Sequence, residues 1–193
     1  MSIYLARVWY RDYQDTRRGR HRRGALPGAT PAETSWIVLG AIVGSLLVLL
    51  QTAGECRLGI TAKQSRVTWL FLLAMVSAGF LEEVVFRGFL VIDHKGRAAL
   101  VGSIVGFSAL FALLHFHWLD WKGAGEGWAR LELNAAAAWW TLSLFLNSLL
   151  FYWLRFSRWN RGRSLIPCFA GHIASNVTVF AVKLFQGYVG GLY

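Results

Sequence analysis

The sequence predicts an all-α, polytopic membrane protein built as a bundle of about five transmembrane helices. Hydrophobic residues make up 55% of the 193 residues and only 16% are charged, which leaves too little polar surface for a soluble domain. Several apolar runs approach the roughly 20 residues that cross about 30 Å of hydrocarbon. These runs are continuous rather than alternating, which argues against a transmembrane β-barrel.

The first 34 residues form a basic segment that carries seven arginines and ends in a stretch containing Pro27 and Pro31. No apolar run directly follows the first residues, so we expect a cytoplasmic tail rather than a simple cleaved signal peptide. Its short amphipathic stretch IYLARVWY is expected to lie on the membrane surface. Residues 35–193 are predicted to form the single membrane-embedded domain.

Five apolar runs are long enough to be transmembrane candidates. They are Trp36–Ala53, Val67–Ile92, Ala98–Leu119, Ala135–Phe156 and Leu165–Tyr188. A glycine-rich loop, DWKGAGEGWARLELN, separates the third run from the fourth. Cys56 and Cys168 form no CxxC motif, so neither a metal site nor a disulfide is inferred from them.

The net charge of +10 is explained by topology rather than by nucleic-acid binding, because cationic residues gather in cytoplasmic segments of membrane proteins. With the N-terminus inside, thirteen lysines and arginines fall in inner segments and five in outer ones. We therefore expect an integral protein of a bacterial or archaeal cell membrane with a cytoplasmic N-terminus and an outer C-terminus. The interfacial tryptophans expected on the outer side are Trp118, Trp121 and Trp128, and on the inner side Trp153 and Trp159.

Residues 80–90, FLEEVVFRGFL, place charges inside the second span. Such charges cost roughly 2.5–3.5 kcal/mol on insertion scales, so they face the bundle interior and pair, or they serve function. Glu83 and Arg87 are four residues apart on one helix face, which predicts an ion pair. Glu82 points about 100° away and has no local partner. A purely structural ion pair would therefore explain Glu83 but leave Glu82 unexplained.

Other spans supply further polar side chains. His115 lies near the outer end of the third span, and His172 and Asn176 share one face of the fifth. A lone histidine in an apolar helix is usually a hydrogen-bonded core residue, but polar groups from three spans favour a shared cavity. His115 lies on the order of 10 Å nearer the outer surface than Glu82 on these boundaries. His117, on a different face from His115, is left out of the predicted site.

These residue types suit hydrolysis of an amide bond. A carboxylate (Glu82) and an imidazole (His115) flanking a water form a general-base arrangement, while His172 and Asn176 could donate to a developing oxyanion. The motifs HExxH, GxSxG and GxxxxGK[ST] are absent. Zinc bound by Glu82, Glu83, His115 and His172 is chemically feasible, but Arg87 beside Glu83 disfavours a dication. We therefore expect no cofactor.

Three short motifs occur in order on separate spans: EEVVFR from Glu82 to Arg87, FALLH from Phe111 to His115, and HIASN from His172 to Asn176. In this pattern the chain resembles the CAAX-protease and bacteriocin-processing (ABI/CPBP) family of intramembrane glutamic endopeptidases. The resemblance covers roughly residues 70–180.

The resemblance implies a metal-free protease in which Glu82 activates water with help from His115. It implies that His172 and Asn176 form the oxyanion hole and that Glu83 and Arg87 support the site. Members often have more spans than the five expected here, which puts the substrate in question more than the chemistry.

The expected partners are the lipid bilayer and a membrane-associated protein or peptide substrate. A prenylated CAAX tail, a bacteriocin leader and a C-terminal sorting helix all remain open as substrates. The alternative is a non-catalytic membrane subunit, namely an immunity factor, chaperone or scaffold in a larger complex. A small transporter is disfavoured because the sequence shows no inverted repeat.

Overall fold

The fold was analysed in a computed structural model that describes residues 2–20, 22–120 and 130–193. The predicted fold class is confirmed, because this part of the chain is an α-helical bundle with one short hairpin. The α-helices are α1 (Ser2–Arg17), α2 (Thr34–Leu58), α3 (Phe71–Glu82), α4 (Arg97–Leu113), α5 (Ala135–Phe156) and α6 (Ile166–Phe185). The shorter elements are a 3₁₀-helix η1 (Thr61–Lys63), a π-helix η2 (Glu83–Phe89) and the antiparallel strands β1 (Leu119–Asp120) and β2 (Arg130–Leu131).

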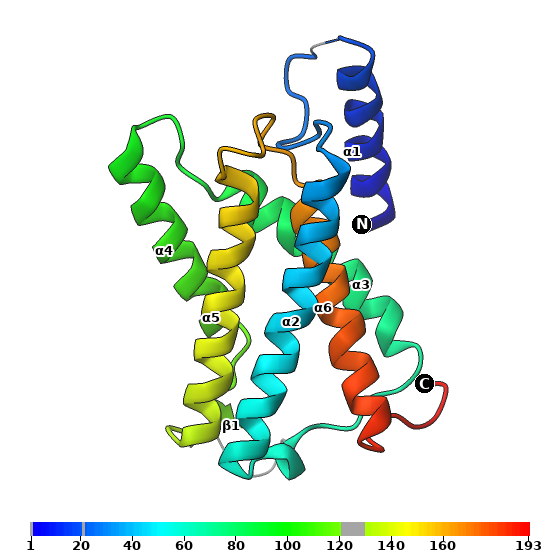
Figure 1. Cartoon of the computed structure of the whole chain (residues 1–193), viewed down its shortest axis with the longest axis vertical. Helices are drawn as coiled ribbons and strands as arrows, with labels where there is room; N and C mark the ends of the chain where they lie inside the picture. Colours follow the sequence, from blue (N-terminus) through cyan, green and yellow to red (C-terminus); the bar gives the residue numbers. More distant parts are fainter. Residues whose placement is uncertain (1, 21, 121–129) are drawn as a thin grey trace.

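The chain alternates in direction as it passes through the bundle (Figure 1). In that view α2, α4 and α6 descend, while α3 with η2 and α5 ascend. The upper end gathers residues 22–33 and the loops before α4 and α6. Leu165 N donates to Gly28 O (3.0 Å), and Arg163 Nη1 donates to Asp93 Oδ2 (2.7 Å). At the lower end, Val67 N donates to Tyr188 O at 2.9 Å. All inner segments of the predicted topology therefore lie at one end.

Three of the five expected spans are long and apolar enough to cross a membrane, namely α2, α5 and α6. The expected second span is shorter than predicted, with 12 residues in α3 that continue into the seven-residue η2. The third ends at Leu113 rather than Leu119, which leaves 17 helical residues, about 25 Å at 1.5 Å per residue. The chain after Leu113 turns, with Phe116 at a φ of 53°. Trp121, Lys122 and Trp128, used in the topology prediction, lie outside the described residues.

Helices α2 and α6 cross closely because two glycines of α2 face the backbone of α6. A Cβ on Gly40 would collide with the carbonyl oxygen of Pro167, and one on Gly44 with that of Gly171. The spacing is that of the GxxxG motif, which lets membrane helices approach within backbone contact. This contact holds His172 and Asn176, both on α6, in the centre of the bundle.

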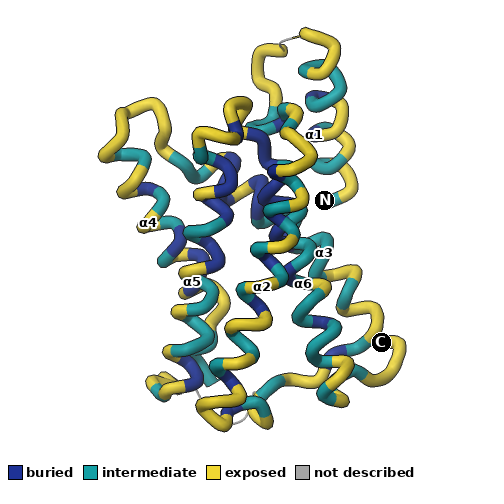
Figure 2. The backbone as a smooth tube through the Cα atoms, in the orientation of Figure 1, coloured by how far each residue is buried: buried dark blue, intermediate teal, exposed yellow. Residues whose placement is uncertain are grey.

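The packed core lies toward the upper end, where buried backbone is concentrated (Figure 2). The basic N-terminal segment contributes to this core through α1. Trp9 is only 6% exposed and packs edge-on against Phe169 with ring centroids 5.1 Å apart. Asp12, also buried, accepts a hydrogen bond from Leu26 N at 2.9 Å. The segment predicted as a tail therefore includes a helix packed on the bundle.

The outer surfaces of the helices carry large apolar side chains. On α2 these are Val38, Ile42, Leu46, Leu49 and Leu50, each at least half exposed. A contiguous apolar surface of this kind is unfavourable in water but suits contact with lipid chains. The composition and the three long apolar helices identify an integral membrane protein.

Candidate active site

The helix that carries the two adjacent acids changes its winding at the site. α3 ends at Glu82 and continues as η2 from Glu83, with Leu90 N donating to Val85 O, five residues earlier, at 2.9 Å. Tyr152 on α5 donates its hydroxyl to Phe86 O at 2.6 Å. Departures from the α-helix of this kind are frequent at functional sites. Here the π-helix lies directly after Glu82 and contains both Glu83 and Arg87.

The ion pair predicted between Glu83 and Arg87 is present. Arg87 Nη1 lies 3.0 Å from Glu83 Oε1, and both side chains are completely buried. Within the described chain the guanidinium nitrogens form no hydrogen bond, so this contact is an ion pair without hydrogen-bond geometry. Aromatic rings surround the guanidinium carbon, with centroid distances of 4.7 Å for Phe111 and 5.2 Å for Tyr152. Such cation–π contacts stabilise a desolvated arginine by roughly 2 kcal/mol.

His172 lies between the two carboxylates. Its Nδ1 is 2.7 Å from Glu83 Oε1, and its Nε2 is 3.6 Å from Glu82 Oε2. A carboxylate accepts hydrogen bonds, so Nδ1 donates to Glu83 and the ring is oriented by that bond. Nε2 is thereby turned toward Glu82. The sequence offered Glu82 no partner on its own helix. In the structure its partner is His172 of α6.

Charged groups surround His172. Glu82 and Glu83 flank its ring, and Arg87 pairs with Glu83. A ring with hydrogen on both nitrogens would donate Nδ1–H to Glu83 and direct Nε2–H toward Glu82 and the cavity.

His115 reaches the site from the turn that follows α4, not from within a helix as the predicted third span required. Its Nδ1 lies 2.8 Å from Phe111 O. A carbonyl oxygen only accepts hydrogen bonds, so Nδ1 carries the hydrogen, and in the neutral ring Nε2 retains its lone pair. The Phe111 ring lies 4.7 Å from the His115 ring and 6.2 Å from the His172 ring. The Phe111 ring therefore lies close to both imidazoles.

Asn176 is anchored across the helix interface. Its Nδ2 donates to Met75 O of α3 at 2.8 Å, and the amide keeps a second N–H for another acceptor. A Cβ on Gly79 would lie 3.2 Å from both Asn176 Nδ2 and His172 Cδ2. Gly79 therefore permits α3 to approach the two polar residues of α6.

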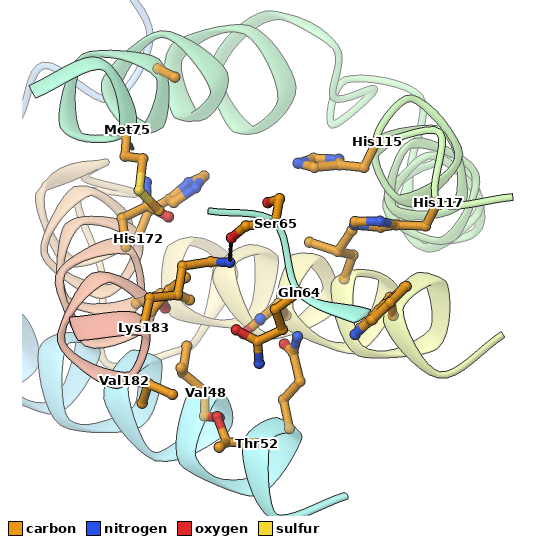
Figure 3. A pocket seen from close by; sticks show the side chains of 18 of the residues that line it. Val48, Thr52, Gln64, Ser65, Met75, His115, His117, His172, Val182 and Lys183 are labelled. Carbon is orange, nitrogen blue, oxygen red and sulfur yellow. Dashed lines mark hydrogen bonds between the residues drawn. The ribbon is translucent and has the colours of Figure 1, made fainter. Parts of the chain in front are cut away.

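One cavity of about 610 Å³ joins these groups, and Glu82, His115, His172 and Asn176 all line it. Figure 3 shows His115 and His172 on opposite sides of the space. The side chain of Glu82 is 31% exposed, whereas that of Glu83 is fully buried. Of the two adjacent acids, Glu82 is thus the one available to a substrate.

The cavity also contains residues that the sequence analysis missed. His117, left out of the predicted site, lines the cavity, and its ring lies 6.3 Å from that of His115. Because the helix ends at Leu113, the spacing of two residues no longer separates the histidines onto different helix faces. Phe111 had been noted only as part of a motif, and nothing in the local sequence indicated its contact with Arg87.

A buried carboxylate, Glu55, lies near the lower end of the cavity. It accepts hydrogen bonds from Gln51 Nε2 (3.1 Å), Gln64 Nε2 (2.6 Å) and Trp140 Nε1 (2.9 Å). The prediction ended the first span at Ala53, which placed Glu55 in a loop. α2 instead continues to Leu58, and Glu55 joins α2, α5 and the η1 region.

The side chains do not fit the zinc site that was considered. Across the described ranges, no group of three or more His, Cys, Asp or Glu side chains is placed to hold a metal ion. His172 Nδ1 is bonded to Glu83, and Glu83 faces Arg87.

Comparison with known proteins decides the family. Residues 64–178 match the family described as type II CAAX prenyl endopeptidase Rce1-like, which is more than half of the chain. The chain belongs to this family. The suspected resemblance to CAAX proteases is thereby confirmed, and the matched region contains Glu82, His115, His172 and Asn176. Family membership supports a membrane-embedded protease. No curated protein and no solved structure gives a significant match.

Proposed function

We propose that the protein is a glutamate-dependent intramembrane endopeptidase that cleaves a membrane-associated protein or peptide. The observation that carries the proposal is the position of Glu82. It faces the cavity from the end of α3, with His172 of α6 beside it and His115 across the space. A carboxylate and an imidazole lone pair on either side of a water are suited to general-base catalysis.

In this mechanism a water held by Glu82 and His115 attacks the carbonyl carbon of the scissile peptide bond. Glu82 accepts the proton of the water as the new C–O bond forms. The negative charge that develops on the carbonyl oxygen is stabilised by His172 Nε2–H and the free N–H of Asn176. Collapse of the tetrahedral intermediate breaks the C–N bond, and Glu82 returns its proton to the departing amine.

The remaining residues position these groups. Glu83 holds the His172 ring through Nδ1, and Arg87 neutralises Glu83. Asn176 is held by Met75 O, and His115 by Phe111 O. Preorganised donors of this kind contribute strongly to catalysis, because they need not reorient as charge develops.

The test compares Glu82→Gln with Glu33→Gln, a matched change at an exposed acid before α2. Each full-length protein is reconstituted in vesicles with a lipid-anchored fluorogenic peptide library, and mass spectrometry locates the cleaved bonds. We expect Glu82→Gln to lower the rate by at least about a hundredfold and Glu33→Gln to retain it. Cleavage by Glu82→Gln at the wild-type rate would overturn the proposal.

The same preparation tests metal dependence. We expect elemental analysis to find no stoichiometric zinc and chelation to leave the rate unchanged. Loss of cleavage on chelation and its return with zinc would refute the metal-free mechanism. A wild-type protein that purifies with a stoichiometric partner and cleaves nothing would indicate the non-catalytic subunit instead.

A further inference from the structure

The cavity contains a cation that the proposed chemistry does not use. Lys183, near the C-terminal end of α6, lines the same cavity as Glu82 and is partly buried. Its Nζ donates to Ser65 O at 2.7 Å and lies 6.0 Å from the centroid of the Tyr188 ring. Figure 3 shows the ammonium directed toward the middle of the cavity. An ammonium has three donors, so the bond to Ser65 leaves further capacity for an anionic ligand.

Within the described residues, no carboxylate lies within ion-pair distance of Lys183. Glu55 lines the same cavity and attracts Lys183 from beyond ion-pair distance, while its oxygens accept three hydrogen bonds from neutral donors. The other acid on the wall, Glu82, is next to His172. A partly desolvated ammonium without a close counter-ion is a favourable place for an anion.

The charge also selects a direction for a bound peptide. A cation attracts a carboxylate and repels a terminal ammonium, so the C-terminal side of a peptide is favoured at Lys183. Lys183 follows Asn176 by seven residues and His172 by eleven, which is about 10–16 Å along a helix. An extended chain covers about 3.3 Å per residue. Roughly three to five residues would therefore separate the cleaved bond from the carboxylate.

On the basis of the proposed function, we propose that Lys183 is a specificity residue that binds the terminal carboxylate of the substrate. The bond fixes the direction in which the peptide enters the cavity and the position at which it is cut. An acidic side chain near the end of the substrate is a second possible source of a carboxylate, and the experiment below separates the two sources.

Binding is measured first, in the Glu82→Gln protein, so that the readout does not depend on turnover. The probes are fluorescent octapeptides that end in four apolar residues and carry either a free C-terminal carboxylate or a C-terminal amide. We expect the free acid to bind roughly tenfold to a hundredfold more tightly, the range for a charge-assisted hydrogen bond. A third probe, an amidated peptide with aspartate as its last residue, tests a side-chain carboxylate and should bind like the plain amide.

Variants of Lys183 then test whether this residue causes the preference for the free acid over the amide. Lys183→Gln should remove the discrimination between acid and amide, and Lys183→Arg should retain most of it. Lys63→Gln is the matched control, because Lys63 lines the same cavity but is exposed. It should leave the ratio unchanged. A general loss of packing would weaken the binding of both peptides equally and would not alter the ratio of their affinities.

Equal binding of acid and amide, absence of binding by both, or a preference that survives Lys183→Gln would each overturn the proposal. Tight binding of the aspartate amide would show that a side-chain carboxylate suffices and would overturn the terminal assignment. Cleavage by the wild-type protein is assayed separately with the same peptides. A preserved binding preference without any cleavage would contradict the proposed endopeptidase while leaving the Lys183 site supported.

Discussion

Glu82 and Glu83 are adjacent in sequence, yet their surroundings give them different chemistry. Glu83 is enclosed and contacts both Arg87 and His172 through Oε1. Glu82 faces the cavity and contacts His172 at a longer distance. One acid is therefore suited to holding the site together and the other to meeting water and substrate.

Glu83→Gln is expected to lower the free energy of unfolding by about 3–5 kcal/mol, because Arg87 would remain as an uncompensated buried charge. Cleavage should fall as well, since an amide holds the His172 ring less strongly than a carboxylate. Thermal unfolding in detergent measures the first effect, and the peptide assay measures the second.

The double variant Glu83→Gln with Arg87→Met separates the two effects. Removing the unpaired guanidinium should recover part of the lost stability but not the lost cleavage. If the single variant unfolds at the wild-type temperature, the buried pair does not contribute as described.

At the scale of helices, the site depends on the close packing of helices against one another as much as on its polar side chains. Gly40 and Gly44 allow α2 to pack closely against α6. Gly79 allows α3 to pack against the face of α6 that carries His172 and Asn176. The π-helix places Glu83 and Arg87 among rings from α4 and α5. A shift of any of these helices would therefore move the proposed catalytic groups, which lie on different elements.

Gly44→Ala tests this dependence on helix packing. The new Cβ would collide with the backbone oxygen of Gly171, and a backbone atom cannot move away as a side chain can. We expect a loss of about 1–3 kcal/mol in stability, as for overpacking in cores, measured by thermal unfolding.

Gly106→Ala on α4 is the matched control, because a Cβ there meets nothing within 4 Å. Alanine also favours a helix over glycine by up to about 1 kcal/mol, so this variant should be neutral or stabilising. Equal behaviour of the two alanine variants would contradict the proposed role of the α2–α6 contact.

At the scale of the whole molecule, all the segments that the charge count assigned to the inner side lie at one end of the bundle (Figure 1). The core is packed near that end (Figure 2). At the other end Val67 N donates to Tyr188 O, and Lys183 donates to Ser65 O nearby. This arrangement is compatible with the expected topology, in which the basic segments share the cytoplasmic side, and the orientation stays a prediction.

The native cysteines allow the orientation to be tested with few changes. Cys56, at the lower end of α2, is exposed, whereas Cys168 is buried. We expect an impermeant maleimide to label Cys56 in intact cells. In a Cys56→Ser background, Arg158→Cys in the opposite loop should be labelled only after permeabilisation. The reverse pattern would show that the predicted orientation is wrong.

Patterns local to the sequence were sufficient for the membrane class, the helical fold and the three motifs. The length of a hydrophobic run indicates whether a segment lies in lipid or in water. The cost of burying charge in a membrane identifies Glu82, Glu83 and Arg87 as residues with a structural or functional role. Helical spacing then correctly predicted the Glu83–Arg87 pair. None of these conclusions required knowledge of which helices touch.

Only the tertiary structure decided what depends on contact between distant segments. The bond from His172 to Glu83, the aromatic rings around Arg87 and the entry of His117 into the cavity all join different elements. No proline marks the end of α4 at Leu113 or the π-helix after Glu82, and neither feature was predicted from the sequence. Lys183 faces the same cavity as Glu82 because α3 and α6 pack together, which periodicity within a single helix cannot reveal.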